Sequence, residues 1–171
     1  MENIEKKQTR VFVMCGPAGS GKSTWLIKQM KPKTDVCISR DNIRFILLQE
    51  GEDYFAHENE VKEIFFDAIA DDTSSSKWEN IYIDATHLNK RSRNKTLNRV
   101  KKTNIGELNC VCFNTPVELC QARNSLRSGR ARVPVSAIDN MFKSYAYPTA
   151  DEGFTHVYVV DAEGVTKEVN V

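Results

Sequence analysis

A glycine-rich segment, GPAGSGKS at residues 16–23, carries the clearest chemical signal in the sequence, because it fills every position of the phosphate-binding pattern G-x-x-x-x-G-K-[ST]. Gly16, Gly19 and Gly21 let the backbone curl so that successive N–H groups point at a phosphate. Lys22 supplies a positive charge for the β- and γ-phosphates, and the Ser23 hydroxyl can ligate Mg²⁺. The segment predicts a site for ATP or another nucleoside triphosphate with Mg²⁺, but it does not identify the group that receives the phosphate.

The flanking residues place this segment where the pattern can work. Residues 10–15, RVFVMC, predict a short buried strand, and residues 24–30, TWLIKQM, predict the first turns of a helix. A helix N-terminus adds a partial positive charge behind a bound phosphate. We assign the nucleotide contacts to Gly16, Ala18, Gly19, Ser20, Gly21, Lys22, Ser23 and Thr24.

An acid and an arginine follow the second predicted strand, residues 35–39. Asp41 stands at the expected N-cap of a helix, and Arg44 lies one turn further on. Asp41 could accept the proton of an attacking hydroxyl as a general base, and Arg44 could hold a phosphate beside that hydroxyl. An ordinary aspartate cap explains the same residue, so both interpretations stay open at this point.

A third polar group, residues 84–89, follows the strand predicted over residues 80–84. An acid such as Asp84 after an apolar strand is typical of a residue that orients Mg²⁺, and a buried cap is the alternative. Thr86 and His87 offer donors and acceptors to a substrate. Because His87 has no second histidine or cysteine at ligand spacing, we do not expect it to bind a metal.

The net charge of +1 conceals a strong segregation of acidic and basic residues. Ten acids and two lysines lie between Glu50 and Glu79, whereas residues 86–105 hold seven lysines or arginines and no acid. A second basic run consists of Arg123, Arg127, Arg130 and Arg132. Phosphoryl transfer needs charge stabilisation, so we expect Arg123 and Arg127, one helical turn apart on one face, to lie over the γ-phosphate. A solvated helix edge is the alternative.

The rest of the chain predicts alternating strands and helices, as in a mainly parallel sheet. Further strands are expected over residues 108–113 and 155–161, the latter followed by a hairpin; further helices are expected over 60–70, 90–102, 116–127 and 134–147, with a polar connection at 71–76. Since ligands bind at the carboxyl ends of parallel strands, the three polar groups should meet at one edge of the sheet. The last two helices flank an arginine-rich break, which predicts a mobile lid over approximately residues 120–146.

Length and composition fit a single domain, because 171 residues with 40% hydrophobic side chains suffice for one core. No apolar run approaches a membrane span and the N-terminus is charged, so we expect a cytoplasmic protein that contacts no membrane. The five cysteines contain no C-x-x-C pair and are expected to be reduced, mostly core-filling thiols. Residues 1–9 are expected to be flexible.

Taken together, these segments resemble the kinase module of the phage-type polynucleotide 5′-hydroxyl kinases. The resemblance lies in residues 16–25, 40–44, 84–89 and 123–127 and in the pair Val133-Pro134, and it covers about residues 10–145. It implies an α/β, P-loop kinase-like fold, a three-layer α/β/α sandwich with a mainly parallel central sheet and a helical lid. We expect no phosphatase domain, because too few residues follow Asp161.

The resemblance implies transfer of the γ-phosphate of ATP to the 5′-hydroxyl end of a DNA or RNA strand. It gives roles to several residues: Lys22 and Ser23 hold the triphosphate and Mg²⁺, Asp41 is the general base, Arg44 holds the neighbouring phosphate of the acceptor, Arg127 is the lid arginine, Thr86 lines the acceptor site and Arg123 is a second lid contact. Relatives in that family assemble, which leaves homo-oligomer formation open.

Two departures from the family pattern put the acceptor in doubt. His87 stands where an asparagine is common, and the lid run from Ser128 to Arg132 is longer and more basic. A P-loop kinase for a small metabolite or nucleotide is therefore one alternative. A non-catalytic module that uses ATP as a switch is another, although Asp41 and the lid arginines argue against it, because a switch needs no base for an acceptor hydroxyl.

Overall fold

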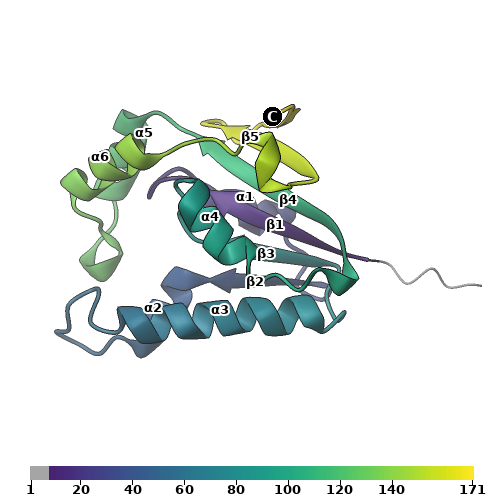
Figure 1. Ribbon diagram of the computed structural model, residues 1–171. Coiled ribbons are helices and arrows are strands. Elements are labelled where there is room, and N and C mark those ends of the chain that lie inside the picture. Colours follow the sequence, from purple (N-terminus) through teal and green to yellow (C-terminus); the bar gives the residue numbers. More distant parts are fainter. Residues whose placement is uncertain (1–7) are drawn as a thin grey trace, which may run out of the picture.

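The structure, a computed structural model, describes residues 8–171 and consists of strands and helices in alternation (Figure 1). The strands are β1 Thr9–Cys15, β2 Asp35–Ser39, β3 Asn80–Asp84, β4 Ile105–Asn114, β5 His156–Asp161 and β6 Thr166–Val169. The α-helices are α1 Lys22–Gln29, α2 Arg40–Leu47, α3 Glu58–Ser74, α4 Lys90–Leu97, α5 Val117–Ser125 and α6 Val135–Ser144. Short 3-10 turns lie at η1 Lys102–Asn104, η2 Gly129–Ala131 and η3 Ala150–Glu152.

The strands form one sheet in the order β2-β3-β1-β4-β5-β6. Neighbouring strands are parallel except for the antiparallel pair β5 and β6, so the chain must cross over between most strands. In register, Ser39 at the end of β2 pairs with Asp84 at the end of β3, and Asp84 pairs with Met14 near the end of β1. The three polar segments that follow these strands therefore leave the sheet at one edge, where open α/β sheets bind ligands.

Alternate residues of β1 face two separate cores, one on each side of the sheet. Val13 packs with Phe65 and Ile69 of α3 on one side. Met14 packs with Trp25 of α1 on the other. The period of two in a strand explains this division, and helices cover both faces. The expected three-layer α/β/α sandwich with a mainly parallel central sheet is confirmed.

Helix α3 continues to Ser74, past the expected end at residue 70. The hydroxyls of Thr73 and Ser74 donate to the carbonyl oxygens of Ile69 and Ala70, each at 2.6 Å, so these polar residues remain helical. The polar connection predicted for residues 71–74 is therefore wrong.

Helix α4 is shorter than expected, because it ends at Leu97 rather than at residue 102. The Lys101 amide donates to the Thr73 hydroxyl (2.9 Å), which draws the chain out of the helix and onto α3. Strand β4 correspondingly begins early, at Ile105.

Arg93 of α4 is fully buried and fastens the chain that follows α6 to the body of the domain. Its Nε and Nη2 donate to the two carboxylate oxygens of Glu152 (2.7 and 2.8 Å), and its Nη1 donates to the carbonyl of Ala146 (2.8 Å). Both charges of this buried pair are hydrogen-bonded, as stability requires. The Tyr145 hydroxyl adds a hydrogen bond to the carbonyl of Cys15 (2.9 Å), directly before the glycine-rich loop.

Within residues 8–171, no helix combines the length and the apolar character needed to cross a bilayer. The segment predicted to be flexible lies outside the described residues except for residues 8 and 9. Thr9 is the buried first residue of β1.

Candidate active site

The glycine-rich segment forms a loop between β1 and α1, and its shape depends on two glycines with left-handed backbone conformations. Gly19 and Gly21 have φ angles of +80° and +101°, which L side chains rarely adopt. A Cβ on Gly19 would lie 2.5 Å from the carbonyl oxygen of Cys120 in α5. Gly21 is the N-cap of α1 and offers no side chain to the first amides of that helix. These N–H groups are left for a ligand, so the loop fits an anion such as a triphosphate.

Lys22 reaches across this loop. Its Nζ donates to the carbonyl oxygens of Gly16 (2.8 Å) and Pro17 (3.0 Å). Burial lowers the pKa of Lys22, and the nearby carboxylates of Asp84 and Asp41 oppose that shift. A desolvated ammonium held in this way is a strong partner for phosphate oxygens.

Asp84 ends β3 and lines the same cavity as Ser23. Burial raises the pKa of Asp84, and the positive charge of Lys22 opposes that shift. Its Oδ2 accepts only a long hydrogen bond from the Ser39 hydroxyl (3.4 Å), and its Oδ1 accepts none from residues 8–171. The exposed Ser23 hydroxyl also has no hydrogen-bond partner in that part of the chain. A desolvated carboxylate and a free hydroxyl are oxygen donors that fit a hard cation such as Mg²⁺.

Asp41 lies in the first turn of α2, but it is not the N-cap. Ser39 occupies that position, and its hydroxyl accepts from the Asn42 amide (3.4 Å). The expected cap position of Asp41 is therefore wrong, and its side chain, 64% exposed, lines the cavity. Oδ1 of Asp41 accepts from Nη1 of Arg44 (2.5 Å) and from the hydroxyl of Tyr54 (2.9 Å). Oδ2 accepts no hydrogen bond from residues 8–171, so one oxygen is fixed while the other stays open.

The guanidinium of Arg44 lines the cavity and is partly engaged by neighbouring side chains, whereas its Nε has no hydrogen-bond partner within the described residues. Its side chain is buried, and besides Asp41 it donates to the Tyr54 hydroxyl (3.0 Å) and to Glu58 of α3 (2.7 Å). Burial alone would lower the pKa of Arg44, but the hydrogen bond to Glu58 and the charges of Tyr54, Glu58 and Asp41 together outweigh burial and raise the pKa. Arg44 therefore binds Asp41 and joins α2 to α3, and its contact with a substrate phosphate stays a prediction.

His87 lies in the interior of the protein and does not line the cavity. Its Nδ1 is 2.8 Å from the carbonyl oxygen of Met14, and its Nε2 is 2.9 Å from the hydroxyl of Thr96. A carbonyl can only accept, so Nδ1 carries the proton and Nε2 accepts from Thr96. Burial lowers the pKa of His87 to about 4 and keeps the ring neutral near pH 7. The predicted substrate contact of His87 is therefore corrected to a structural role.

The segment between α5 and α6 lines the cavity. Hydrogen bonds join its two ends to each other and attach its middle to the opposite wall. The buried Asn124 side chain donates to the carbonyl of Val133 (2.7 Å) and accepts from its amide (2.9 Å), which ends α5 and closes residues 126–132 into a loop. Nη1 of Arg130 donates to the carbonyl oxygens of Leu48 (3.2 Å) and Gln49 (3.4 Å) on the opposite wall. Figure 1 shows this green segment reaching toward the chain that follows α2. The mobility of the lid stays a prediction.

Arg123 and Arg127 have different surroundings. Arg123 donates to the carbonyl oxygens of Gly19 (3.4 Å) and Ala162 (3.0 Å), so it joins α5 to the glycine-rich loop and to the turn after β5. Because α5 ends at Ser125, the two arginines do not share one helix face, and that expectation is wrong. Arg127 is exposed, lines the cavity, and makes no side-chain hydrogen bond or ion pair with residues 8–171. Its charge is therefore available to a ligand.

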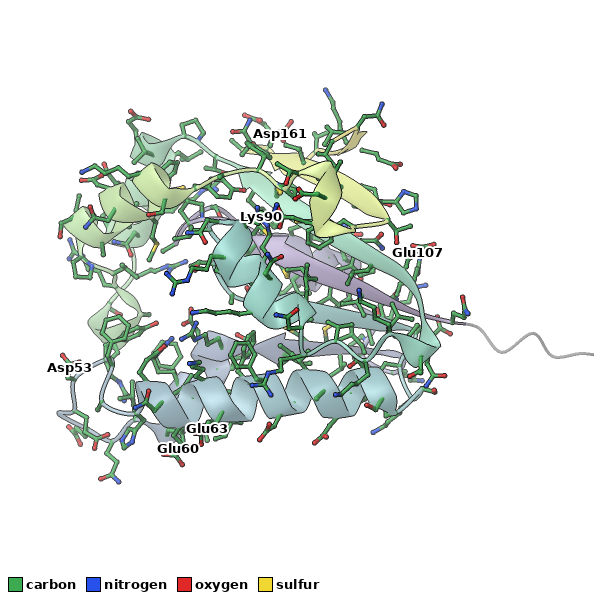
Figure 2. The ribbon with its side chains drawn as sticks, viewed as in Figure 1. Asp53, Glu60, Glu63, Lys90, Glu107 and Asp161 are labelled. Carbon is green, nitrogen blue, oxygen red and sulfur yellow. The ribbon has the colours of Figure 1, made fainter. Side chains whose placement is uncertain are left out.

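A single cavity of about 1370 Å³ brings these residues together. In Figure 2, Asp53 marks the loop after α2 and Asp161 marks the end of β5, and both residues line it. The half-buried Thr86 also lines it, and its carbonyl accepts from the Gly16 amide (2.9 Å). The predicted site residues in its walls are Ala18, Gly19, Ser20, Gly21, Lys22, Ser23, Thr24, Asp41, Arg44, Asp84, Thr86, Arg123 and Arg127, whereas Gly16 and His87 are not among them.

Sequence reasoning missed two residues that contact Asp41 or Arg44, one in the loop between α2 and α3 and one at the start of α3. Tyr54 and Glu58 lie in a strongly acidic stretch that matches no motif, and only the structure shows them beside Asp41 and Arg44. Two adjacent aromatic residues within an acidic surface segment were the one available signal.

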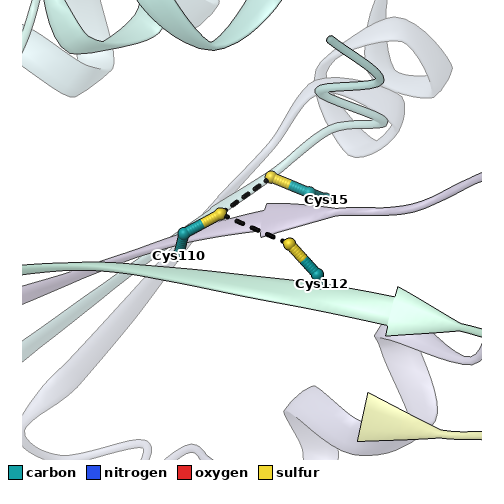
Figure 3. A group of neighbouring side chains, drawn as sticks. All are labelled: Cys15, Cys110 and Cys112. Carbon is teal, nitrogen blue, oxygen red and sulfur yellow. Dashed lines mark hydrogen bonds between the residues drawn. The ribbon is translucent and has the colours of Figure 1, made fainter. Parts of the chain in front are cut away.

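Three cysteines gather on one face of the β1 and β4 pair (Figure 3). The Sγ atom of Cys110 lies 3.3 Å from that of Cys15 and 3.7 Å from that of Cys112. All three are buried, and burial raises the pKa of Cys15, which favours the protonated thiol. A structural zinc site uses four ligands, and no fourth histidine, cysteine or acid from the described residues joins this group. The cluster therefore packs as core thiols.

Comparison with known proteins matches most of the chain to one family model. Residues 11–148 match a family model described as an AAA domain. No curated protein matches the chain in sequence.

Several solved structures share the fold at low sequence identity. A chain of the Pnkp1/Rnl/Hen1 RNA repair complex is 21% identical with a TM-score of 0.66, over 84% of this chain and 46% of that chain, so the present chain spans less than half of that protein. A gluconokinase from Sinorhizobium meliloti 1021 is 18% identical with a TM-score of 0.55, over 91% of this chain and 84% of that chain. Kti12 from Chaetomium thermophilum, in complex with ADP-AlF3, is 15% identical with a TM-score of 0.62, over 89% of each chain.

These likenesses establish a P-loop kinase-like fold, a class in which nucleotide binding with Mg²⁺ is typical. The matched segment runs from β1 through the glycine-rich loop and the Asp41 helix to the end of α6, and it includes most of the chain. The protein therefore belongs to this AAA domain family.

Proposed function

We propose that this protein transfers the γ-phosphate of ATP to the 5′-hydroxyl end of a DNA or RNA strand. The observation that carries the proposal is the open Oδ2 of Asp41 in the same cavity as the glycine-rich loop. A carboxylate with one oxygen fixed and the other free is suited to accept a proton from an incoming hydroxyl. A nucleotide-binding switch has no use for such a group.

The donor half of the reaction belongs to the loop and to Lys22. The amides at the start of α1 and the ammonium of Lys22 bind the β- and γ-phosphates and orient them toward the cavity. Ser23 and Asp84 would hold Mg²⁺, which neutralises charge on the phosphate oxygens when it is bound.

In the transfer step, the acceptor oxygen forms a bond to the γ-phosphorus, and the bond between that phosphorus and the β,γ-bridging oxygen breaks. The proton of the acceptor hydroxyl passes to Oδ2 of Asp41, and ADP leaves. The unpaired guanidinium of Arg127 stabilises negative charge on the transferring group.

The acceptor class rests on the resemblance and on the charge of the lid. Arg127 and Arg132 both line the cavity, and neither side chain has a hydrogen-bond partner within residues 8–171. Two unpaired guanidinium groups in the wall of this cavity suit a phosphodiester chain better than a neutral metabolite. A small hydroxylated metabolite is the second candidate, because the gluconokinase shares the fold over most of both chains.

The test is a transfer assay with γ-labelled ATP and Mg²⁺. Acceptors are 5′-hydroxyl DNA and RNA oligonucleotides, the same oligonucleotides with a 5′-phosphate as matched controls, and a panel of nucleosides and sugars. We expect label on the 5′-hydroxyl oligonucleotides and none on the 5′-phosphorylated controls. Label confined to small molecules would overturn the proposal in favour of the second candidate, and ATP binding without any transfer would favour a switch.

A further inference from the structure

We propose that Phe45, Tyr54 and Phe55 form a stacking subsite for one of the first two nucleobases of the acceptor strand. This inference rests on the proposed function and specifies which side chains bind a base of the acceptor strand. The subsite consists of the end of α2 and the loop before α3, opposite the arginine-bearing lid.

The three rings form one contiguous aromatic surface. The ring centroids of Phe45 and Tyr54 lie 6.2 Å apart and those of Tyr54 and Phe55 lie 4.8 Å apart, each pair in an edge contact. All three residues line the cavity that contains Lys22 and Asp41. Each edge-to-face contact covers one face of one ring and leaves its opposite face uncovered by that contact, and nucleobases of any identity can stack on an aromatic face.

The exposure of these rings has no explanation in the packing of the domain. Phe55 is 62% exposed and Phe45 is 36% exposed, and neither belongs to the two buried cores. An aromatic side chain held in the open wall of a cavity is typical of a binding surface.

Tyr54 sets the distance between this surface and the reacting group. Its hydroxyl donates to Asp41, and its ring contacts Phe55 in an edge-to-face pair. The length of one tyrosine side chain therefore separates Asp41 from the Phe55 ring. A nucleoside whose 5′-hydroxyl reaches Oδ2 of Asp41 therefore has its own base, or the next one, within reach of the aromatic surface.

Charge orients the strand across the cavity. The guanidinium of Arg44 lies 4.5 Å from the centroid of the Tyr54 ring and 5.8 Å from that of Phe55, which favours stacking of an electron-rich base on the other faces of these rings. Asp53 lines the same wall and repels phosphates, whereas Arg127 and Arg132 line the lid. Bases are therefore directed to the aromatic wall and phosphates to the lid.

The experiment compares variants of Phe55 on intact and abasic acceptors. The substrates are 5′-hydroxyl oligonucleotides that are intact, abasic at the first nucleotide, or abasic at the second. The variants are Phe55→Ala, Phe55→Trp as the conservative replacement, and Ile46→Ala as a control, because Ile46 is an 82% exposed apolar residue of α2 that does not line the cavity. Steady-state kinetics give KM for the oligonucleotide, KM for ATP, and kcat.

Phe55→Ala should raise KM for the intact oligonucleotide roughly 5- to 100-fold, as expected for the loss of one base-aromatic stack, and leave KM for ATP unchanged. Phe55→Trp and Ile46→Ala should retain the wild-type KM. On one of the two abasic substrates, the wild type and Phe55→Ala should have the same KM for the oligonucleotide, because the base that stacks on Phe55 is missing. If Phe55→Ala leaves KM unchanged, or raises KM equally on all three substrates, the subsite is overturned and the proposed function stands. If the wild type transfers phosphate to no oligonucleotide, the proposed function and the subsite are overturned together.

Discussion

The hydroxyl of Tyr54 donates a hydrogen bond to Oδ1 of Asp41 at 2.9 Å, the same oxygen that accepts from Arg44. Two donors on one oxygen fix the rotation of the carboxylate and leave Oδ2 open to the cavity. Burial and the Asp41 carboxylate raise the pKa of Tyr54 to about 12, so the phenol stays protonated and remains a donor at neutral pH. Tyr54 is therefore a positioning residue for Asp41 under the proposed mechanism.

Replacing Tyr54 by phenylalanine should lower kcat about 10- to 100-fold, because a hydrogen bond to a charged group is lost and the carboxylate gains freedom. KM for ATP should not change, since the donor phosphates bind on the loop. Steady-state kinetics on Tyr54→Phe separate these quantities, and Tyr158→Phe on β5 is the matched control. A raised KM for ATP with an unchanged kcat would show that Tyr54 acts on the nucleotide instead.

Asp41→Asn should reduce kcat by roughly 10²- to 10⁴-fold, because the proton acceptor is removed while the side-chain shape is kept. ATP affinity, measured by equilibrium titration, should stay at the wild-type value. In the Asp41→Asn background, Tyr54→Phe should have no further effect on kcat, since both changes act through one carboxylate. Equal losses of ATP affinity and kcat would place Asp41 in the triphosphate site and contradict its role as base.

The sequence could predict the phosphate-binding loop because the loop is local. One strand, one loop and one helix turn contain residues 16–24, and the glycines encode the loop shape directly. The acceptor half could not be predicted in the same way. Arg44 is fixed by Glu58 from a different helix, and His87 is satisfied by Met14 and Thr96, so the fate of each side chain depends on partners that spacing along the chain does not reveal.

Fold class was predictable for a similar reason, since alternating apolar strands and amphipathic helices specify a parallel sheet. Helix ends were not. Back-bonding by Thr73 and Ser74 lengthens α3, and a side-chain contact from Asn124 to Val133 ends α5. Propensity alone favours neither outcome, because Ser, Thr and Asn can support or end a helix according to which acceptor lies near.

Replacement of the two lid arginines should have different effects, a loss of kcat for Arg127 and a loss of stability for Arg123. Arg127→Ala should leave the melting temperature unchanged, because the side chain is exposed and unpaired within the described chain, but it should lower kcat about 100-fold or more. Arg123→Ala should cost about 1 to 3 kcal/mol of stability, because its hydrogen bonds to the carbonyl oxygens of Gly19 and Ala162 are lost. Thermal unfolding and kinetics on both variants test this division.

A matched control for these variants is Arg91→Ala, which removes an exposed arginine from α4 outside the cavity. Its melting temperature and kcat should equal those of the wild type. If Arg127→Ala lost stability instead of kcat, the assignment of Arg127 to the transferring phosphate would be wrong.

His87 should make the stability of the protein depend on pH. Its pKa is about 4 in the folded state against 6.5 for an unperturbed imidazole, so the unfolded chain binds more protons between these values. The free energy of unfolding should therefore fall as the pH falls through this range, with His87 contributing about 2 kcal/mol of the loss between pH 7 and pH 5. The physical cause is that a charged imidazolium must be desolvated and must give up the hydrogen bond that Nε2 accepts from Thr96.

Urea unfolding of the wild type and of His87→Gln at pH 7 and pH 5 isolates this contribution, because carboxylates elsewhere titrate in both proteins. At pH 7 the variant should be less stable than the wild type, since its side chain does not reproduce both buried hydrogen bonds of His87. Between pH 7 and pH 5, however, the free energy of unfolding of the variant should fall by about 2 kcal/mol less than that of the wild type. Parallel losses in both proteins would mean that the ring takes up its proton while still folded. In that case the neutral, fully hydrogen-bonded His87 derived from its contacts with Met14 and Thr96 would be wrong.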